Sequence, residues 1–266
     1  MSSNNKNLHN GFLTLVNAIE KLTDQKIDFS QDFEPVDMQE LRRKEALEAH
    51  REIALLRRQK RLNQIESLHS SNIINPKWTF QTVITDSNNS QALASAEGFC
   101  ASVNMANSLG VAPSLLLIQG GPGVGKTVLC HCVANKVLTS SMFDVEIHSY
   151  SDIKRVRAPS SNDSNADKVE KQNLWDRMVS VDLLIIDGLC QNNESFTNFD
   201  RLTFPELLRI RRSKGLPLVV TTSLLPSEIR DRIGEESYES LKEYSVLAVA
   251  LFGQSRRADF NFKGIR

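Results

Sequence analysis

SLLLIQGGPGVGKTVL, at residues 114–129, is the stretch that decides the fold of this chain. Its apolar run at 115–118 is typical of a buried strand, and it opens into GGPGVGKT at 120–127 before apolar residues resume at helical spacing. Strand, loop and helix in this order are the setting in which G-x-x-x-x-G-K-[ST] forms a phosphate-binding loop. The stretch therefore predicts a site for a nucleoside triphosphate, and a glycine-rich turn without a ligand is the weaker alternative.

Each residue type in this loop suits the binding of phosphate. The glycines permit backbone angles that turn several N–H groups toward one anion, and the helix that follows adds its positive N-terminal end. Lys126 can reach the β- and γ-phosphates, and the Thr127 hydroxyl can bind Mg²⁺. The residues expected to contact the triphosphate are Gly120, Gly121, Pro122, Gly123, Val124, Gly125, Lys126, Thr127 and Val128.

A second apolar run, VDLLIID at residues 181–187, supplies the other half of such a site. A nearly continuous apolar run is typical of a central parallel strand, and ligands bind at the carboxyl ends of such strands. Asp187 stands at this end, where its carboxylate can hold the water shell of a Mg²⁺ ion. The alternative is an aspartate that only caps the strand.

Strands and helices alternate along residues 73–266. Strands are expected at 115–118, 143–147, 181–187, 218–222 and 246–252, and helices at 91–109, with Gly110 just past its end, at 174–179, and from Thr203, with Pro205 in its first turn, to residue 214. Alternation of this kind predicts a doubly wound α/β fold with a parallel sheet.

The first 72 residues have a different character. Apolar residues recur at helical spacing over 8–22 and 36–68, and Pro76 in IINPKW marks the end of this region. We expect a helical hairpin that buries its apolar stripe on a partner, or else on its own globular domain. The domain boundaries are therefore 1–72 and 73–266.

The second of these helices is strongly basic between residues 41 and 61. Eight cations, Arg42, Arg43, Lys44, Arg51, Arg57, Arg58, Lys60 and Arg61, stand against three acids, Glu45, Glu48 and Glu52. Such a run is consistent with a solvated face, an acidic partner or phosphates, and the sequence leaves the three open.

Composition excludes other classes. The formal net charge is zero, so the molecule as a whole is not drawn to nucleic acid or to a membrane surface. The sequence shows no apolar run of about 18 residues and no signal peptide, so a cytoplasmic protein without a membrane partner is expected. The cysteines, Cys100, Cys130, Cys132 and Cys190, suit a reducing compartment, and Cys130-His131-Cys132 is expected to pack in the core, because helical neighbours two apart point in different directions.

Three motifs in this order, GGPGVGKT, VDLLIIDGL and GLPLVVTTS, resemble those of DnaC-type helicase loaders and IstB-type ATPases of the AAA+ class. LHSSNIINPKWTFQ is similar to the segment that precedes this domain in DnaC-type proteins. The likeness covers residues 65–258 by motif and 1–64 only by arrangement. It implies a five-stranded AAA+ domain without a helical lid after Phe252, and ATP as the nucleotide.

The resemblance also implies partners. Residues 1–72 would bind a hexameric, DnaB-type replicative helicase, and the AAA+ domain would use ATP and single-stranded DNA to control ring opening and release. Self-assembly into a ring or spiral on the helicase is part of this expectation. An IstB-like transposase accessory on duplex DNA is the alternative, and a small-molecule kinase is disfavoured by the N-terminal helices and the absence of an arginine-rich lid.

Catalytic positions of the family are altered here. Gly188 replaces the glutamate that orients the attacking water, and Glu236 and Ser240 in IGEESYESL replace two arginines that stabilise the γ-phosphate. Asp187 and Thr222, at the sensor position, remain as catalytic candidates. Because an arginine finger is worth several orders of magnitude in rate, we expect ATP binding with slow hydrolysis. Rescue by Glu194, or by Arg230 or Arg232 across a subunit interface, stays open.

The family binds single-stranded DNA beside the helix after the second strand. Here that region contains Tyr150, Lys154, Arg155 and Arg157, a combination suited to base stacking and phosphate contact. A solvated surface with Tyr150 in the core is the equal alternative. A second basic cluster consists of Arg209, Arg211, Arg212 and Lys214, and Arg257 in the closing motif is a weaker candidate for a contact with nucleotide or a neighbour.

Overall fold

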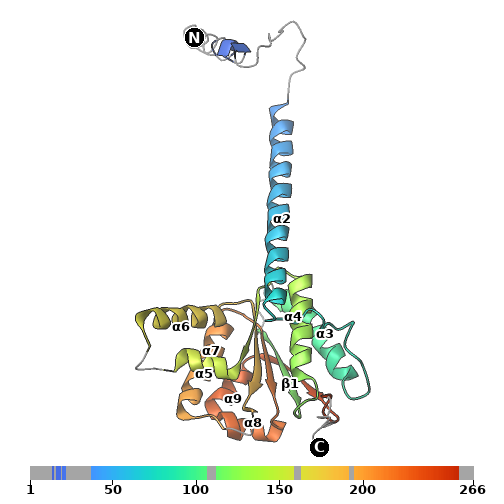
Figure 1. Ribbon diagram of the computed structural model, residues 1–266, viewed down its shortest axis with the longest axis vertical. Coiled ribbons are helices and arrows are strands. Elements are labelled where there is room, and N and C mark those ends of the chain that lie inside the picture. The colour runs from blue at the N-terminus through green and yellow to red at the C-terminus, as the bar shows by residue number, and fades with distance from the viewer. Residues whose placement is uncertain are drawn as a thin grey trace, which may run out of the picture. The chain divides into compact units, whose positions relative to one another are not determined.

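The computed structural model describes residues 14, 16–18, 20–21, 37–106, 112–158, 163–191 and 195–257, with the backbone alone at 104–106. The chain divides into two compact units, Met1–Gln59 and Lys60–Arg266 (Figure 1). The boundary falls inside helix α2 (Met38–Ser70), which agrees closely with the helix predicted at 36–68. Most of the helix predicted at 8–22 lies outside the described residues, as do Gly110 and Glu194.

Within the first unit, the described part of α2 is solvated on every side. Each residue from 37 to 59 is exposed, including large apolar side chains such as Leu55 at 64% and Leu56 at 71%. Lys44 pairs with Glu40 one turn earlier, at 2.9 Å. A helix whose described residues bury no face in their own unit is stabilised mainly by such pairs along its surface.

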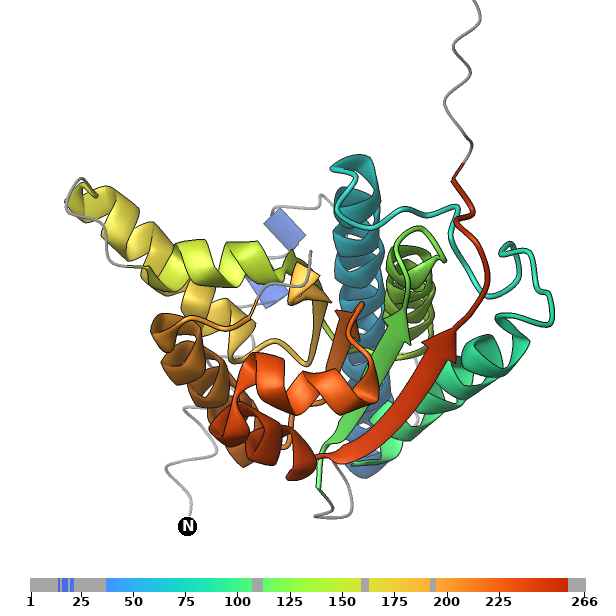
Figure 2. The ribbon, with the colours of Figure 1, turned by 90° about the horizontal axis from the view of Figure 1, so that it is seen from below.

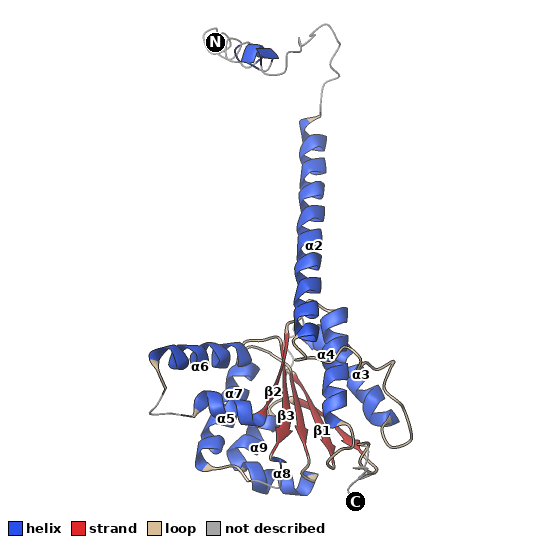
Figure 3. Cartoon of the chain, in the orientation of Figure 1, coloured by secondary structure: helices blue, strands red, loops and turns tan. Residues whose placement is uncertain are grey.

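Five parallel strands form the centre of the second unit (Figure 3). The strands are β1 (Ser114–Gly120), β2 (Val145–Ser149), β3 (Leu183–Leu189), β4 (Leu218–Thr222) and β5 (Ser245–Leu251), in the order β2-β3-β4-β1-β5. This is the predicted doubly wound α/β sheet, and its five strands agree with the AAA+ expectation. β2 begins two residues later than predicted.

Helices cover both faces of the sheet (Figure 2). On one face lie α3 (Ser90–Ala106) and α4 (Lys126–Ser140); on the other lie α5 (Tyr150–Arg157), α6 (Asn165–Met178), α7 (Asn198–Ser213), α8 (Pro226–Ile233) and α9 (Glu235–Lys242). Successive strand residues point to opposite faces, so Leu116 packs under α3 and α4 while Leu115 belongs to the other core. Both faces are apolar, which explains the continuous apolar runs.

Three helices begin with a capping box. Ser149 with Asp152, Ser164 with Asp167, and Thr197 with Asp200 each exchange side-chain and backbone hydrogen bonds, and these begin α5, α6 and α7. The prediction that Thr203 caps a helix was therefore wrong. The Thr197–Asp200 box starts α7 six residues earlier, and Pro205 lies inside the helix.

The last turns of α2 are fixed to α4 and β2 within the second unit. Arg61 is buried, and it donates hydrogen bonds to the Leu138 and Phe143 carbonyls and to the Asp144 carboxylate. This guanidinium satisfies the carbonyl of Leu138, near the end of α4. None of the described helices has the length and apolar character needed to cross a bilayer.

Candidate nucleotide-binding site

The phosphate loop runs from the end of β1 to the start of α4, as predicted. Gly125 caps α4 with a φ of 110°, and Gly123 has a φ of 77°, values that favour glycine. A Cβ at Gly120 would lie 2.7 Å from the Leu251 carbonyl oxygen, so this position requires glycine because β5 passes close by. The loop therefore presents its backbone at the N-terminus of α4, where an anion is stabilised.

Lys126 lies across the mouth of this loop. Its ammonium donates to the carbonyl oxygens of Gly120, at 2.8 Å, and Gly121, at 2.9 Å, and it lies 3.2 Å from the Ser223 hydroxyl. Burial lowers the pKa of Lys126, and the negative charge of Asp187 partly opposes this effect. A phosphate would supply the compensating charge that a half-buried ammonium lacks.

Thr127 and Asp187 converge from two different elements. The Thr127 hydroxyl, in the first turn of α4, donates to Asp187 Oδ2 at 2.8 Å, and the Thr221 hydroxyl of β4 donates to Asp187 Oδ1 at 2.5 Å. Hydroxyl and carboxylate oxygens are ligands that Mg²⁺ prefers. The donor set therefore fits Mg²⁺ bound with a triphosphate.

The hydroxyls of the TTS triplet at the end of β4, residues 221–223, have separate partners. Thr222, predicted as the sensor, is buried; its hydroxyl donates to the Leu189 carbonyl at 3.0 Å and accepts from the Leu224 N–H. The neighbours Thr221 and Ser223 are the ones that reach Asp187 and Lys126. Sequence reasoning missed both, although a run of three hydroxyl residues at a strand end was a signal. The sensor role of Thr222 stays a prediction.

Comparison with known families decides the affiliation. The model of the bacterial DnaA ATPase domain matches residues 74–230, more than half of the chain. The chain belongs to this family. The matched residues lie within the unit that contains the phosphate loop, and they include β1 to β4 but not β5.

Individual relatives are more distant. The chromosomal replication initiator DnaA of Lactiplantibacillus plantarum is 30% identical over 161 residues, 59% of this chain and 32% of that protein. The DnaA of Streptococcus mutans is 28% identical over 171 residues, which cover 60% of this chain and 33% of that protein. The chain spans about a third of the length of these curated relatives.

Solved structures confirm the AAA+ fold. A DnaI structure matches with a TM-score of 0.54 at 19% identity, over 71% of this chain and 100% of that one. The DnaC helicase loader matches with a TM-score of 0.53 at 16% identity, over 66% and 98%. DnaA bound to AMPPCP and single-stranded DNA also matches with 0.53, at 18% identity, over 69% and 53%.

The side chains expected at or near the family's catalytic positions form contacts within this chain. Gly188 has a φ of 85°. Glu236 pairs with Arg209 at 3.2 Å, and Ser240 is buried in α9. Arg230 donates to Glu235 at 2.6 Å, and Arg232 lies 3.3 Å from the Ser195 hydroxyl. Both arginines of α8 are therefore held within the chain.

The segment after β5 crosses the phosphate loop. The Arg256 N–H donates to the Gly123 carbonyl at 3.0 Å, and its guanidinium pairs with Asp86 at 2.7 Å. A Cβ at Gly123 would lie 2.2 Å from Ser255 Oγ, so this approach requires glycine. Arg257 lies near enough for its charge to lower the pKa of Lys126, after the larger effect of burial.

The predicted DNA-binding side chains of α5 are mostly engaged. Tyr150 is buried, stacks on Phe196 with ring centroids 5.0 Å apart, and donates to Asp200 at 3.1 Å. Arg155 pairs with Asp152 at 2.7 Å, and Lys154 lies 3.5 Å from Asp200. The alternative in which Tyr150 belongs to the core is confirmed, so this ring is not exposed for base stacking.

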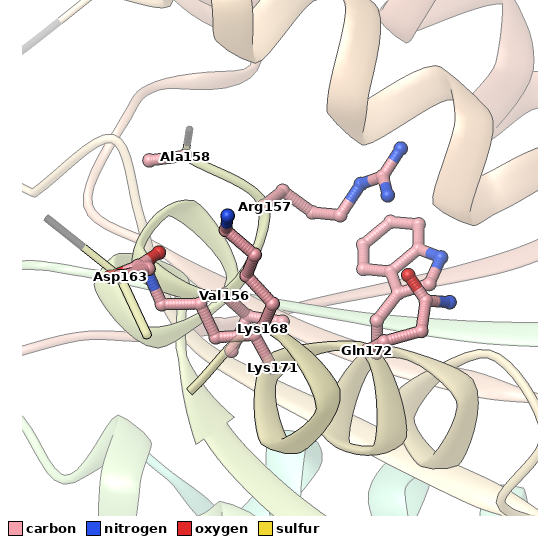
Figure 4. Close-up of a pocket in the computed structure, with 8 residues that line it drawn as sticks. Val156, Arg157, Ala158, Asp163, Lys168, Lys171 and Gln172 are labelled. Atoms are coloured by element: carbon pink, nitrogen blue, oxygen red, sulfur yellow. The ribbon is translucent and has the colours of Figure 1, made fainter. Parts of the chain in front are cut away.

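One pocket of about 220 Å³ opens between α5 and α6 (Figure 4). Its lining includes Arg157, Lys168 and Lys171, and the Arg157 guanidinium lies 4.5 Å above the ring of Trp175. Arg157 pairs with Glu206 at 2.9 Å and Lys171 with Asp163 at 2.6 Å.

Of the second basic cluster, Arg209, Arg212 and Lys214 are exposed, whereas Arg211 is not at the surface. Arg211 is fully buried, and it donates to the carbonyls of Met178, Val181, Asp182 and Pro217. Lys214 donates to the Val179 carbonyl at 3.3 Å, and Arg212 pairs with Glu243 at 2.7 Å. Arg211 therefore joins α7 to the loops around it and cannot contact DNA.

The Cys-His-Cys run lies in the core, as predicted. Cys130 and Cys132 are fully buried, and burial raises the pKa of Cys132 to about 12. His131 Nδ1 accepts the Asn75 N–H at 3.2 Å, and its ring packs edge-on against Trp78. The described residues contain no group of three His, Cys, Asp or Glu side chains suited to a metal ion.

Proposed function

We propose that this protein is an ATP-binding helicase loader of DNA replication. It binds the hexameric replicative helicase through residues 1–72 and uses ATP and single-stranded DNA to control ring opening and release. The observation that carries the proposal is the convergence of Lys126, Thr127 and Asp187 on one phosphate loop.

ATP binding would exchange the internal partners of Lys126 for phosphate oxygens. Its bonds to the Gly120 and Gly121 carbonyls would be replaced by bonds to the β- and γ-phosphates. The negative phosphates would then compensate the positive charge of Lys126, which burial disfavours. Mg²⁺, held by Thr127 and Asp187, would neutralise part of the phosphate charge. The glycines of the loop would direct backbone N–H groups at the same oxygens.

Hydrolysis is proposed to be slow. Gly188 has no side chain to orient water, and the positions of the two arginines hold Glu236 and the buried Ser240. In a ring or spiral, Arg230 or Arg232 could act on the nucleotide of a neighbouring subunit only after leaving its contact with Glu235 or with the Ser195 hydroxyl, respectively. The protein would therefore work as a nucleotide-occupied clamp.

The exposed apolar side chains of α2 support the helicase part of the proposal. Leu55, Leu56 and Ile53 remain 46–71% exposed, which favours burial against another protein. Basic residues between them would add electrostatic steering toward an acidic partner surface.

The side of the domain with α5 and α6 supports single-stranded DNA binding. With Tyr150 buried, the remaining contacts would be charged, from Lys168 and from Arg157 beside Trp175 in the pocket of Figure 4. Binding would then depend on phosphate contacts and fall with salt. A cytoplasmic location accords with these partners.

Calorimetry with Mg²⁺ and a non-hydrolysable ATP analogue tests the nucleotide site. We expect binding by the full chain, its loss in Lys126→Ala, and its retention in Lys136→Ala, a matched control further along α4 whose side chain pairs with Glu97. A Lys126→Ala variant that binds normally would refute the site.

Co-purification with the replicative helicase of the same cell tests the partner. The double variant Leu55→Ser, Leu56→Ser should lose the helicase while keeping ATP binding, and Ile84→Ser, at an equally exposed apolar position of the second unit, should keep both. Tight binding to duplex DNA without helicase binding would instead support the IstB-like alternative.

A second candidate is a regulatory module that associates with a DnaA-type initiator. The family match over residues 74–230 favours it, because two domains of one fold can associate head to tail through equivalent surfaces, as subunits do in rings and filaments. Nucleotide-dependent binding to the initiator of the same cell, with no binding to the helicase, would establish this role.

A further inference from the structure

Gln191 occupies the space that a side chain at position 188 would need. A Cβ built on Gly188 would lie 1.8 Å from Gln191 Nε2, 2.5 Å from its Cδ and 2.8 Å from its Cγ. Gly188 also has a φ of 85°, a conformation that L side chains rarely adopt. The backbone at 188 therefore favours glycine, and a side chain there would have to displace the Gln191 amide.

This amide stands beside the groups expected to hold Mg²⁺ and the triphosphate. The Gly188 N–H donates to the Thr221 hydroxyl at 2.8 Å, and that hydroxyl donates to Asp187. Thr127 bonds to the other oxygen of the same carboxylate. The Gln191 side chain therefore lies directly next to the end of this chain of hydrogen bonds.

Within the described ranges, the side-chain amide of Gln191 leaves hydrogen-bonding capacity unused. The residue is exposed, and its side chain forms no hydrogen bond with any other residue in the described ranges. A carboxamide offers one acceptor oxygen and two N–H donors. An amide of this kind, placed where the catalytic carboxylate of related sites begins, has the chemistry to hold a water molecule.

We propose that Gln191 positions the attacking water in place of the carboxylate missing at residue 188. The inference rests on the proposed ATP site. Gln191 Oε1 would accept a hydrogen bond from the water, whose oxygen forms a bond to the γ-phosphorus. The bond from the γ-phosphorus to the bridging oxygen breaks, its electron pair leaves with ADP, and the proton of the water passes to a γ-phosphate oxygen.

The inference also explains why turnover should be slow without being absent. A carboxamide orients water by hydrogen bonding, but it is too weak a base to accept the proton. Phosphoryl transfer depends mainly on positioning and on charge stabilisation, so an amide can serve. Gln191, rather than Glu194, is then the residue that compensates for Gly188.

Single-turnover hydrolysis of γ-labelled ATP by the full-length protein tests the role. Gln191→Met keeps the volume over Gly188 but removes the hydrogen bonds, and it should lower the rate constant about 5- to 10-fold, the effect of one neutral hydrogen bond. Gln191→Glu keeps an acceptor oxygen and should restore the rate or exceed it. Gln81→Met, at another exposed glutamine of the second unit, is the matched control and should have no effect.

Two further measurements separate positioning from folding. The dissociation constant for ATP and the melting temperature should be the same in Gln191→Met and in the wild type, because only the water contact is lost. Gly188→Glu should fail to accelerate hydrolysis, since residue 188 has a φ of 85° and a side chain there would first have to displace the Gln191 amide. Faster hydrolysis by Gly188→Glu with Gln191 in place would overturn the inference.

The outcomes distinguish this inference from the proposed function. A wild-type protein that does not bind ATP refutes both. A protein that binds ATP but hydrolyses it no faster than buffer does, or at a rate indifferent to Gln191→Met, refutes the role of Gln191 alone and leaves the clamp intact.

Discussion

Replacing Arg211 with methionine should destabilise the protein although it removes no ion pair. The guanidinium is fully buried and donates to four carbonyl oxygens, of which the bonds to Met178, at 2.9 Å, and Pro217, at 2.7 Å, are buried. Methionine fills most of the space but leaves those acceptors without partners. Each unpaired buried acceptor costs about 1–3 kcal/mol, so two cost about 2–6 kcal/mol.

The loss is smaller than this sum because the cost of burying the cation disappears with it. Burial lowers the pKa of Arg211 to about 10, and its Nε has no partner among the described residues, so the folded state already carries a penalty for this charge. We therefore expect a net loss of about 3 kcal/mol, a large share of the 5–15 kcal/mol typical of a domain.

Urea unfolding followed by circular dichroism measures this loss. Arg212→Met is the matched control, because Arg212 is the next residue of α7 and forms only an exposed pair with Glu243, expected to contribute about 0–1 kcal/mol. The effect of Arg211→Met should be constant from pH 6 to 9, since the guanidinium stays charged there in both states. Equal midpoints for the two variants would refute the role of the buried carbonyls.

Three further predictions concern single contacts. Burial lowers the pKa of His131 below 6.5, so as the pH falls this histidine takes up a proton in the unfolded chain before it does in the folded one. The free energy of unfolding should therefore decrease below pH 7, and it should decrease less in His131→Asn. Urea unfolding at several pH values measures the difference. Tyr150→Phe should cost about 1 kcal/mol and leave the affinity for single-stranded DNA, measured by fluorescence anisotropy, unchanged, whereas a drop in affinity would contradict burial of the ring. Asp86→Asn removes the ion pair with Arg256 and should speed trypsin cleavage after Arg256, which mass spectrometry follows. High salt should also speed cleavage of the wild type, because it screens an exposed ion pair. Unchanged cleavage in the variant would mean that this pair does not hold the segment after β5.

Short sequence patterns were enough to predict those elements whose characteristic residues are adjacent in the sequence. The phosphate loop, the strand that contains Asp187 and the long helix at 36–68 all lie within a few residues of the predicted positions. Strands buried on both faces need continuous apolar runs, and a phosphate loop needs glycines at fixed positions, so both can be recognised in the sequence.

The start of α7 and the burial of one residue in a basic cluster could not be predicted from the sequence. Thr203 and Thr197 have the same local chemistry, and only the exchange of hydrogen bonds with Asp200 shows which of them begins α7. Arg211 was grouped with Arg209 and Arg212, but α7 turns this one position into the core. A charge in a sequence does not show which face of its helix will be buried.

The sequence by itself predicted that a phosphate-binding loop precedes a helix and that Asp187 stands near the carboxyl end of a central strand, and it places at 188 a glycine, which has no side chain to orient water. Only the tertiary structure decided that Thr221 and Ser223 reach Asp187 and Lys126, and that the Gln191 amide lies over Gly188. The reason is that a motif fixes backbone geometry over a few adjacent residues, whereas these contacts join strands and loops that meet only when the sheet is complete.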